Sequence, residues 1–161
     1  MEKRPWFEDI VLPALLRHAR STYGTAMRRA LVKAGYDDVP KNGLYVIGGL
    51  ALGAGGVPLG QLVKELAISK QAAGQLVDTL VLRGYLERTV DEQDRRRLTV
   101  TLTERGKGAA AAQTAAREEI DAALLAAVGL KQLNVTRRTL AALVGLGRKP
   151  DERVEITDGG C

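Results

Sequence analysis

The sequence predicts a mainly α-helical protein with one small β-hairpin, an α+β fold. Long segments near both ends carry apolar residues at helical spacing, and two short segments in the middle alternate apolar with polar residues. With 161 residues, of which 45% are hydrophobic, the chain is long enough to bury a core as a single domain. The net charge of +5 and the pI of about 9.6 give a mild bias toward polyanionic partners.

Residues 86–90 and 98–102 are the two predicted strands of the hairpin. Residues alternate with period two in both, with apolar or β-branched side chains on one face apart from Arg88, so each strand is expected to bury one face. The first strand alternates Leu86, Arg88 and Val90 with Glu87 and Thr89. The connecting DEQDRRR has six charges in seven residues and must project into water. Such a tip is either merely solvated or, through its three arginines, reaches a narrow minor groove; we favour the second interpretation.

The helix predicted at residues 70–83 precedes the hairpin. Ser69 is a good N-cap, and Gly84 suits the left-handed position after the last turn. An apolar stripe is expected to face the core and leave Lys70, Gln71 and Gln75 exposed. Amide side chains pair with adenine, and lysine pairs with guanine or phosphate. The helix alone would also be consistent with an ordinary surface helix.

A second short helix is predicted directly before it, with Pro58 at its first position and an apolar stripe ending at Leu66. Only a few residues separate Leu66 from Ser69, so the two helices must cross steeply, as in a helix-turn-helix. Together with the hairpin they predict a winged helix-turn-helix flanked by helices.

Residues 58–106 resemble the winged helix-turn-helix of the MarR family of transcriptional regulators. The matching segments are SKQAAGQLVDTLVLRGYLER and DRRRLTVTLTERG, in order and at the family's spacing. The resemblance implies that Asp94 orients the wing arginine Arg96, which enters the minor groove. It also implies that Arg95 and Arg97 contact phosphates or form salt bridges within the wing. We therefore expect DNA contacts from Ser69, Lys70, Gln71, Gln75, Arg95, Arg96 and Arg97.

Helices are also predicted on both sides of this domain. The first runs from about Leu12 to Gly35, two follow at 107–128 and 134–146, and 147–161 are predicted to be a disordered tail. The resemblance implies that residues 6–57 and 107–146 interlock two chains into a homodimer that reads an inverted-repeat operator in double-stranded DNA. The alternative is that these helices pack within one chain.

The resemblance further implies a small aromatic or anionic ligand that releases the protein from DNA. Candidate lining residues are His18, Tyr23, Tyr36 and Tyr45, each of which also fits a core or interface role. Cys161 is the one cysteine, which excludes an intrachain disulfide and a cysteine zinc cluster, and no metal, cofactor or catalytic group is expected.

The predicted function is therefore a cytoplasmic DNA-binding regulator, most simply a repressor, and not an enzyme. The alternative from another class is a winged-helix interaction or architectural module without an operator. The uncharged segment 42–63 holds seven glycines, which argues against a transmembrane span.

Overall fold

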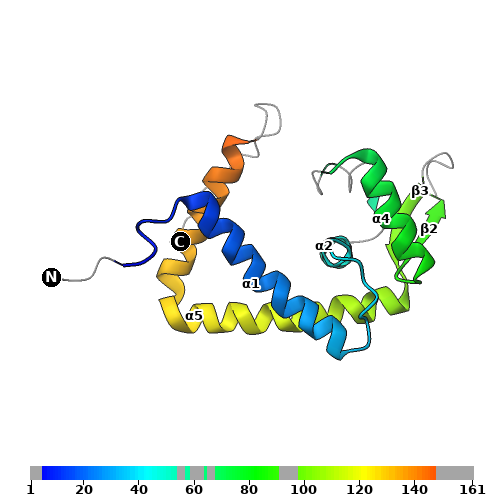
Figure 1. Cartoon of the computed structure of the whole chain (residues 1–161), viewed down its shortest axis with the longest axis horizontal. Helices are drawn as coiled ribbons and strands as arrows, with labels where there is room; N and C mark the ends of the chain where they lie inside the picture. Colours follow the sequence, from blue (N-terminus) through cyan, green and yellow to red (C-terminus); the bar gives the residue numbers. More distant parts are fainter. Residues whose placement is uncertain (1–4, 54–56, 59–63, 65–67, 91–97, 148–161) are drawn as a thin grey trace, which may run out of the picture. The chain divides into compact units, whose positions relative to one another are not determined.

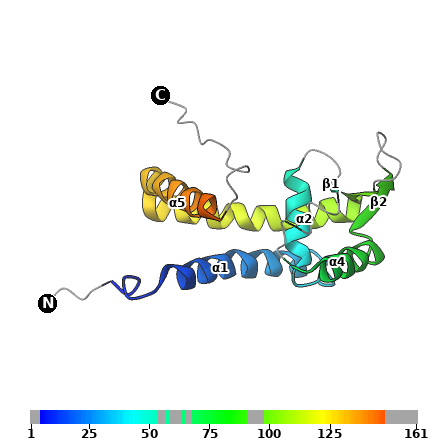
Figure 2. The same ribbon diagram turned by 90° about the horizontal axis from the view of Figure 1, so that it is seen from above.

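The computed structural model describes residues 5–53, 57–58, 64, 68–90 and 98–147; for 57, 58 and 98 it describes the backbone only. Residues 1–120 and 121–161 form two compact units, each of which is considered by itself. Figures 1 and 2 trace the elements in two views. In chain order they are α1 (Leu12–Lys33), α2 (Gly43–Leu52), β1 (Val57–Pro58), α4 (Lys70–Leu82), β2 (Leu86–Val90), β3 (Leu98–Leu102) and α5 (Glu104–Leu146).

The predicted hairpin is confirmed as strands β2 and β3, which pair antiparallel from Leu86↔Leu102 to Val90↔Leu98. The expectation of a buried face along the whole of β2 is wrong. Leu86 is buried, but Arg88 and Val90 are exposed. On β3 the core reaches Val100, the partner of Arg88, whereas on β2 it covers only Leu86.

Pro58 does not begin a helix, which corrects the sequence prediction. It lies in β1, which pairs antiparallel with β3 as the edge of a three-stranded sheet of order β1-β3-β2. Proline is compatible with an edge strand because its missing N–H removes no bond to a further neighbour. The rest of the predicted helix at 58–66 lies outside the described residues, except for Lys64, which is helical.

One core unites the elements of residues 1–120. Leu31 of α1, Ile47 of α2 and Leu80 of α4 are fully buried, and they join Tyr85 and Val100 of the hairpin region in a single cluster. The first turns of α5 add Ala109 and Ala110 to the same cluster. The winged domain thus packs on α1, α2 and the start of α5, which positions α4.

Most helix ends agree with the sequence. Pro13 lies in the first turn of α1, and Gly35 and Gly84 follow α1 and α4 with φ of 84° and 75°. Thr103 caps α5, because its hydroxyl accepts a hydrogen bond from Gly106 N at 3.1 Å.

Gly129 interrupts α5 with φ of 76° and ψ of 160°, which confirms the prediction that the helix from 107 ends there. Helical conformation resumes directly after it, so the last helix begins earlier than the predicted residue 134. The tail predicted to be disordered lies outside the described residues from 148 onward. None of the described helices is long and apolar enough to cross a membrane.

Candidate nucleic-acid interface

Helix α4 presents one polar face and buries the other. Ala73, Val77 and Leu80 are buried, whereas Lys70, Gln71 and Gln75 are exposed. Within the described part of the chain, these three exposed side chains form no hydrogen bond or ion pair. Their donors and acceptors are therefore available to another molecule.

Ser69 starts this helix, as predicted. Its Oγ accepts a hydrogen bond from Ala72 N at 3.1 Å, and its backbone is extended, with ψ of 151°. The cap occupies an acceptor lone pair, so the Ser69 hydroxyl retains its hydrogen as a donor. The first two turns of α4 therefore offer a hydroxyl, an ammonium and two amides, at Ser69, Lys70, Gln71 and Gln75.

A charged contact that the sequence reasoning missed joins α4 to the wing. Arg88 of β2 forms an ion pair with Asp78 of α4, and both side chains are exposed. The alternation that predicted a buried Arg88 concealed this role. Thr89 and Thr99 also face each other across the two strands, with their hydroxyl oxygens 2.7 Å apart. The ion pair joins the hairpin to α4, and the threonine contact joins the two strands of the hairpin.

The wing residues Asp94, Arg95, Arg96 and Arg97 lie outside the described residues. The described structure does locate both ends of their loop. Val90 and Leu98, which flank it, are paired partners at the end of the hairpin. Both flanking residues therefore lie at the end of the hairpin away from its buried base.

A second polar cluster, which the sequence did not predict, lies where α4, the wing and α5 meet. The Asp38 cluster consists of Asp38, Arg83, Tyr85 and Arg105. The Asp38 carboxylate accepts hydrogen bonds from the Tyr85 hydroxyl and from Arg105 Nη2, the latter at 2.9 Å. The Arg105 guanidinium lies 4.6 Å from the centre of the Tyr85 ring, and Arg83 donates to the Asp38 carbonyl oxygen.

The charges of the cluster shift its titration. The hydrogen bond from Tyr85 lowers the pKa of Asp38 below its usual 3.8, and Arg105 adds to this against the opposing effect of burial. Burial, followed by the Asp38 carboxylate, raises the pKa of Tyr85. The cluster is therefore stabilised as a carboxylate, a neutral phenol and a guanidinium.

These shifts predict a dependence of stability on pH. Because the folded pKa of Asp38 is depressed, its contribution is present above the unfolded pKa of about 4 and is lost as pH falls through the folded pKa. Asp38→Asn should therefore lose less stability than the wild type on acidification below about pH 4. Urea unfolding at a series of pH values measures this difference, and Glu119→Gln is a carboxylate-to-amide control. Parallel pH curves for Asp38→Asn and the wild type would contradict the assignment.

The four residues predicted to line a ligand site have different surroundings in the structure. His18 is exposed on α1, and Tyr23 is half-buried on the same helix. Tyr36 packs edge-on against Tyr85, with ring centres 6.1 Å apart. Only Tyr45, among these four, lines a cavity that also holds several basic side chains.

This cationic pocket lies between α1 and the start of α2 and has a volume of about 660 Å³. Among the described residues, no acid lines it. The Arg20 guanidinium lies 4.4 Å from the centre of the Tyr45 ring, and Arg28 donates to three backbone carbonyls, among them Pro40 O at 3.0 Å. Its basic residues are Arg17, Arg20, Arg28, Arg29 and Lys41. The pocket therefore combines an aromatic ring with excess positive charge.

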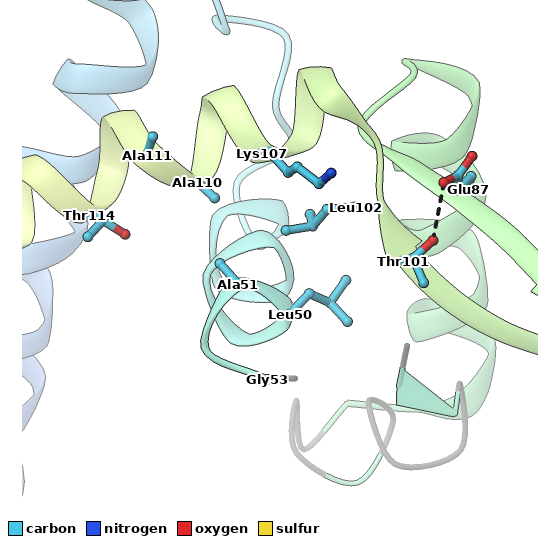
Figure 3. A pocket seen from close by; sticks show the side chains of 10 residues that line it. All are labelled: Leu50, Ala51, Gly53, Glu87, Thr101, Leu102, Lys107, Ala110, Ala111 and Thr114. Carbon is cyan, nitrogen blue, oxygen red and sulfur yellow. Dashed lines mark hydrogen bonds between the residues drawn. The ribbon is translucent and has the colours of Figure 1, made fainter. Parts of the chain in front are cut away.

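A different cavity, of about 570 Å³, lies at the base of the wing between α2, the hairpin and α5. Figure 3 shows apolar Leu50 and Leu102 along it, with Lys107 and Glu87 nearby. These charges are already engaged, since Lys107 pairs with Glu104 at 2.6 Å and Thr101 donates to Glu87 at 3.4 Å. No described group of His, Cys, Asp and Glu side chains could hold a metal ion.

The sequence model of the MarR family matches residues 44–97, which span α2, β1, α4, β2 and the wing loop. This segment belongs to the MarR family. The resemblance that the recognition-helix and wing segments indicated is confirmed, and the MarR-type segment contains every residue expected to contact DNA. No curated protein sequence matches the chain.

Solved structures of MarR-type proteins share the fold. MepR from S. aureus in its DNA-binding conformation aligns with a TM-score of 0.73 at 18% identity, over 86% of this chain and 100% of that chain. A MepR mutant bound to an oligodeoxyribonucleotide aligns with a TM-score of 0.54 at 19% identity, over 87% and 100%. Apo MarR from E. coli aligns with a TM-score of 0.61 at 18% identity, over 83% and 97%. At these identities the likeness establishes the winged-helix fold with its flanking helices.

Proposed function

We propose that this MarR-type chain is a sequence-specific DNA-binding transcriptional regulator, a repressor, that acts as a homodimer on an inverted repeat. The observation that carries the proposal is the polar face of α4, where Lys70, Gln71 and Gln75 are exposed and unengaged within the described chain while the opposite face is buried. An α-helix with these side chains fits the major groove. The MepR structure with an oligodeoxyribonucleotide supports this use of the fold.

The wing supplies the second proposed contact. Arg96 would enter the minor groove, oriented by Asp94, while Arg95 and Arg97 would contact phosphates or stabilise the wing. Narrow minor grooves have enhanced negative potential, which attracts arginine. The Arg88–Asp78 ion pair, which joins β2 to α4, supports concerted placement of both elements.

Exposed apolar residues support the homodimer. Residues 121–146 leave many large apolar side chains uncovered in the single chain, and soluble monomers rarely expose so large a group without a partner. We assign dimerisation to 6–57 and 107–146, and the winged domain to 58–106. The exposed residues in the C-terminal half of α5 are Leu124, Leu125, Val128, Leu130, Val135, Leu140, Leu143, Val144 and Leu146.

A small aromatic anion is the proposed releasing ligand, and the cationic pocket around Tyr45 supports it. A carboxylate would meet Arg17 or Arg29, which have no partner in the described chain, and its ring would pack beside Tyr45. The ligand weakens DNA binding only if it prefers the conformation that does not fit DNA. The regulator would act in the cytoplasm, where the operator is accessible.

The DNA-reading assignment is tested with Lys70→Ala, and Lys33→Ala on α1 is a charge-matched control. If Lys70 contacts a phosphate, the slope of log affinity against log salt should become shallower by about 0.9, since one counterion fewer is released. Fluorescence anisotropy with a labelled duplex at several salt concentrations measures the slope. An unchanged slope for Lys70→Ala would remove this residue from the interface, and an equal change in Lys33→Ala would make the effect non-specific.

A further inference from the structure

The Asp38 cluster brings together four segments that are distant in sequence. Asp38 lies in the loop between α1 and α2, Arg83 at the end of α4, Tyr85 just before β2, and Arg105 in the first turn of α5. Tyr85 is fully buried, and it contacts Asp38 through its hydroxyl and Arg105 through its hydroxyl and its ring face. The cluster thus forms a polar contact, here called the joint, between α4, which is proposed to bind DNA, and the start of α5, which continues into the proposed dimerisation region.

The backbone at this joint is packed without spare room. A Cβ atom at Gly106 would overlap the Tyr85 carbonyl oxygen, and one at Gly108 would overlap the Tyr36 hydroxyl. Thr103 donates from its hydroxyl to Gly84 O at 2.5 Å and from its backbone to Tyr85 O at 3.1 Å. The start of α5 therefore lies directly on Gly84 and Tyr85, the residues that follow α4.

Stability alone does not explain the polar part of this joint. The Asp38 and Arg105 side chains are 41% and 45% exposed, and ion pairs this exposed contribute little to folding. Their hydrogen bonds with the buried Tyr85 hydroxyl are directional, however. These bonds therefore restrict the orientation of the segments that they join more than they add to the free energy of unfolding. Groups with this geometry select one orientation of α4 relative to the start of α5.

We propose that Asp38, Tyr85 and Arg105 are positioning residues that set which half-site spacing the dimer accepts. This inference rests on the proposed function. In a dimer that reads two half-sites about 34 Å apart, the orientation of α4 on the start of α5 determines the separation of the two reading helices. None of the three residues needs to touch DNA to determine the accepted spacing.

The test uses Tyr85→Phe, which keeps the buried ring and removes the hydroxyl, and Arg105→Gln. Lys107→Gln is the matched control, because Lys107 lies two residues further along α5 and pairs with the exposed Glu104. Each protein is titrated with duplexes that hold the inverted repeat at its natural spacing, at spacings altered by one or two base pairs, and with a single half-site. Thermal unfolding is recorded in parallel.

Tyr85→Phe and Arg105→Gln should bind the natural spacing about tenfold more weakly, because a charge-assisted hydrogen bond is lost from the joint. They should bind the single half-site as the wild type does, and should discriminate less between spacings. Lys107→Gln should match the wild type throughout. An unchanged spacing preference would overturn the proposal, and so would an equal loss on every duplex, which would show a merely structural role.

The wild-type titration and one further measurement keep the outcomes distinct. If the wild type itself shows no preference for any inverted repeat, the proposed function fails; if the wild type discriminates and both variants discriminate equally well, only the positioning role fails. Should Tyr85→Phe not fold, the further measurement uses Arg105→Gln alone. A spin label is attached to Leu82→Cys, since Leu82 is 88% exposed, and Cys161→Ser removes the natural thiol. The label–label distance distribution in the dimer should broaden relative to the labelled wild type, and an unchanged distribution would overturn the proposal.

Discussion

Replacing Gly106 with alanine is expected to destabilise the protein by about 3 kcal/mol or more, the upper range for overpacking of a tightly packed site. The added methyl group would overlap the backbone carbonyl oxygen of Tyr85 and approach the Leu102 side chain at 3.0 Å. A backbone atom cannot rotate away as a side chain does. The start of α5 would therefore have to separate from the residue that joins α4 to the wing.

Chemical denaturation with circular dichroism measures this loss, and Gly49→Ala is the matched control. Gly49 is a helical glycine of α2, and a Cβ there would meet nothing within 4 Å. Alanine at Gly49 should stabilise by up to about 1 kcal/mol through helix propensity. A Gly106→Ala protein as stable as the wild type would show that α5 does not pack on Tyr85 as described.

The second large effect concerns the proposed dimer. The double variant Leu125→Asp/Val144→Asp is expected to be monomeric and to bind a full inverted repeat at least about 100-fold more weakly. Linking two DNA-binding domains in a dimer raises the affinity for two half-sites by about this factor. Both side chains are exposed in the single chain, at 42% and 56%, so the charges should not disturb the folded monomer. A partner surface over them, in contrast, would have to bury two carboxylates.

Sedimentation and DNA titration of the same samples decide the outcome. Gln132→Asp, which replaces an exposed polar residue of α5, should remain dimeric and bind as the wild type does. A doubly substituted protein that still sediments as a dimer would place the interface elsewhere. One that is monomeric but retains full affinity would contradict the need for a dimer.

Local signals predicted much of the fold. The cap at Ser69, the glycines that follow α1 and α4, and the two strands of the hairpin follow from local sequence patterns, and the structure agrees with them. The exposed face of α4 also followed from helical spacing alone. The DNA contacts assigned to that face and to the wing remain predictions.

Features set by tertiary contacts were not predictable in the same way. Pro58 fits both a helix start and an edge strand, and only its pairing with β3, about 40 residues later, decides between them. Burial of β2 stops after Leu86 although the paired strand β3 is buried as far as Val100, and alternation does not reveal this difference between the strands. The Asp38–Arg105 contact spans 67 residues and leaves no periodic signal in the sequence.

Binding of the purified protein to the intergenic DNA beside its own gene, against a scrambled duplex at about 150 mM salt, tests the central claim most directly. The salt concentration must be the same for both duplexes, because the sequence-independent part of the DNA affinity depends steeply on it. A regulator that reads an operator should prefer the native DNA by about 1000-fold. Equal and weak binding to both duplexes would contradict the account and would favour a winged-helix module whose partner is not this DNA.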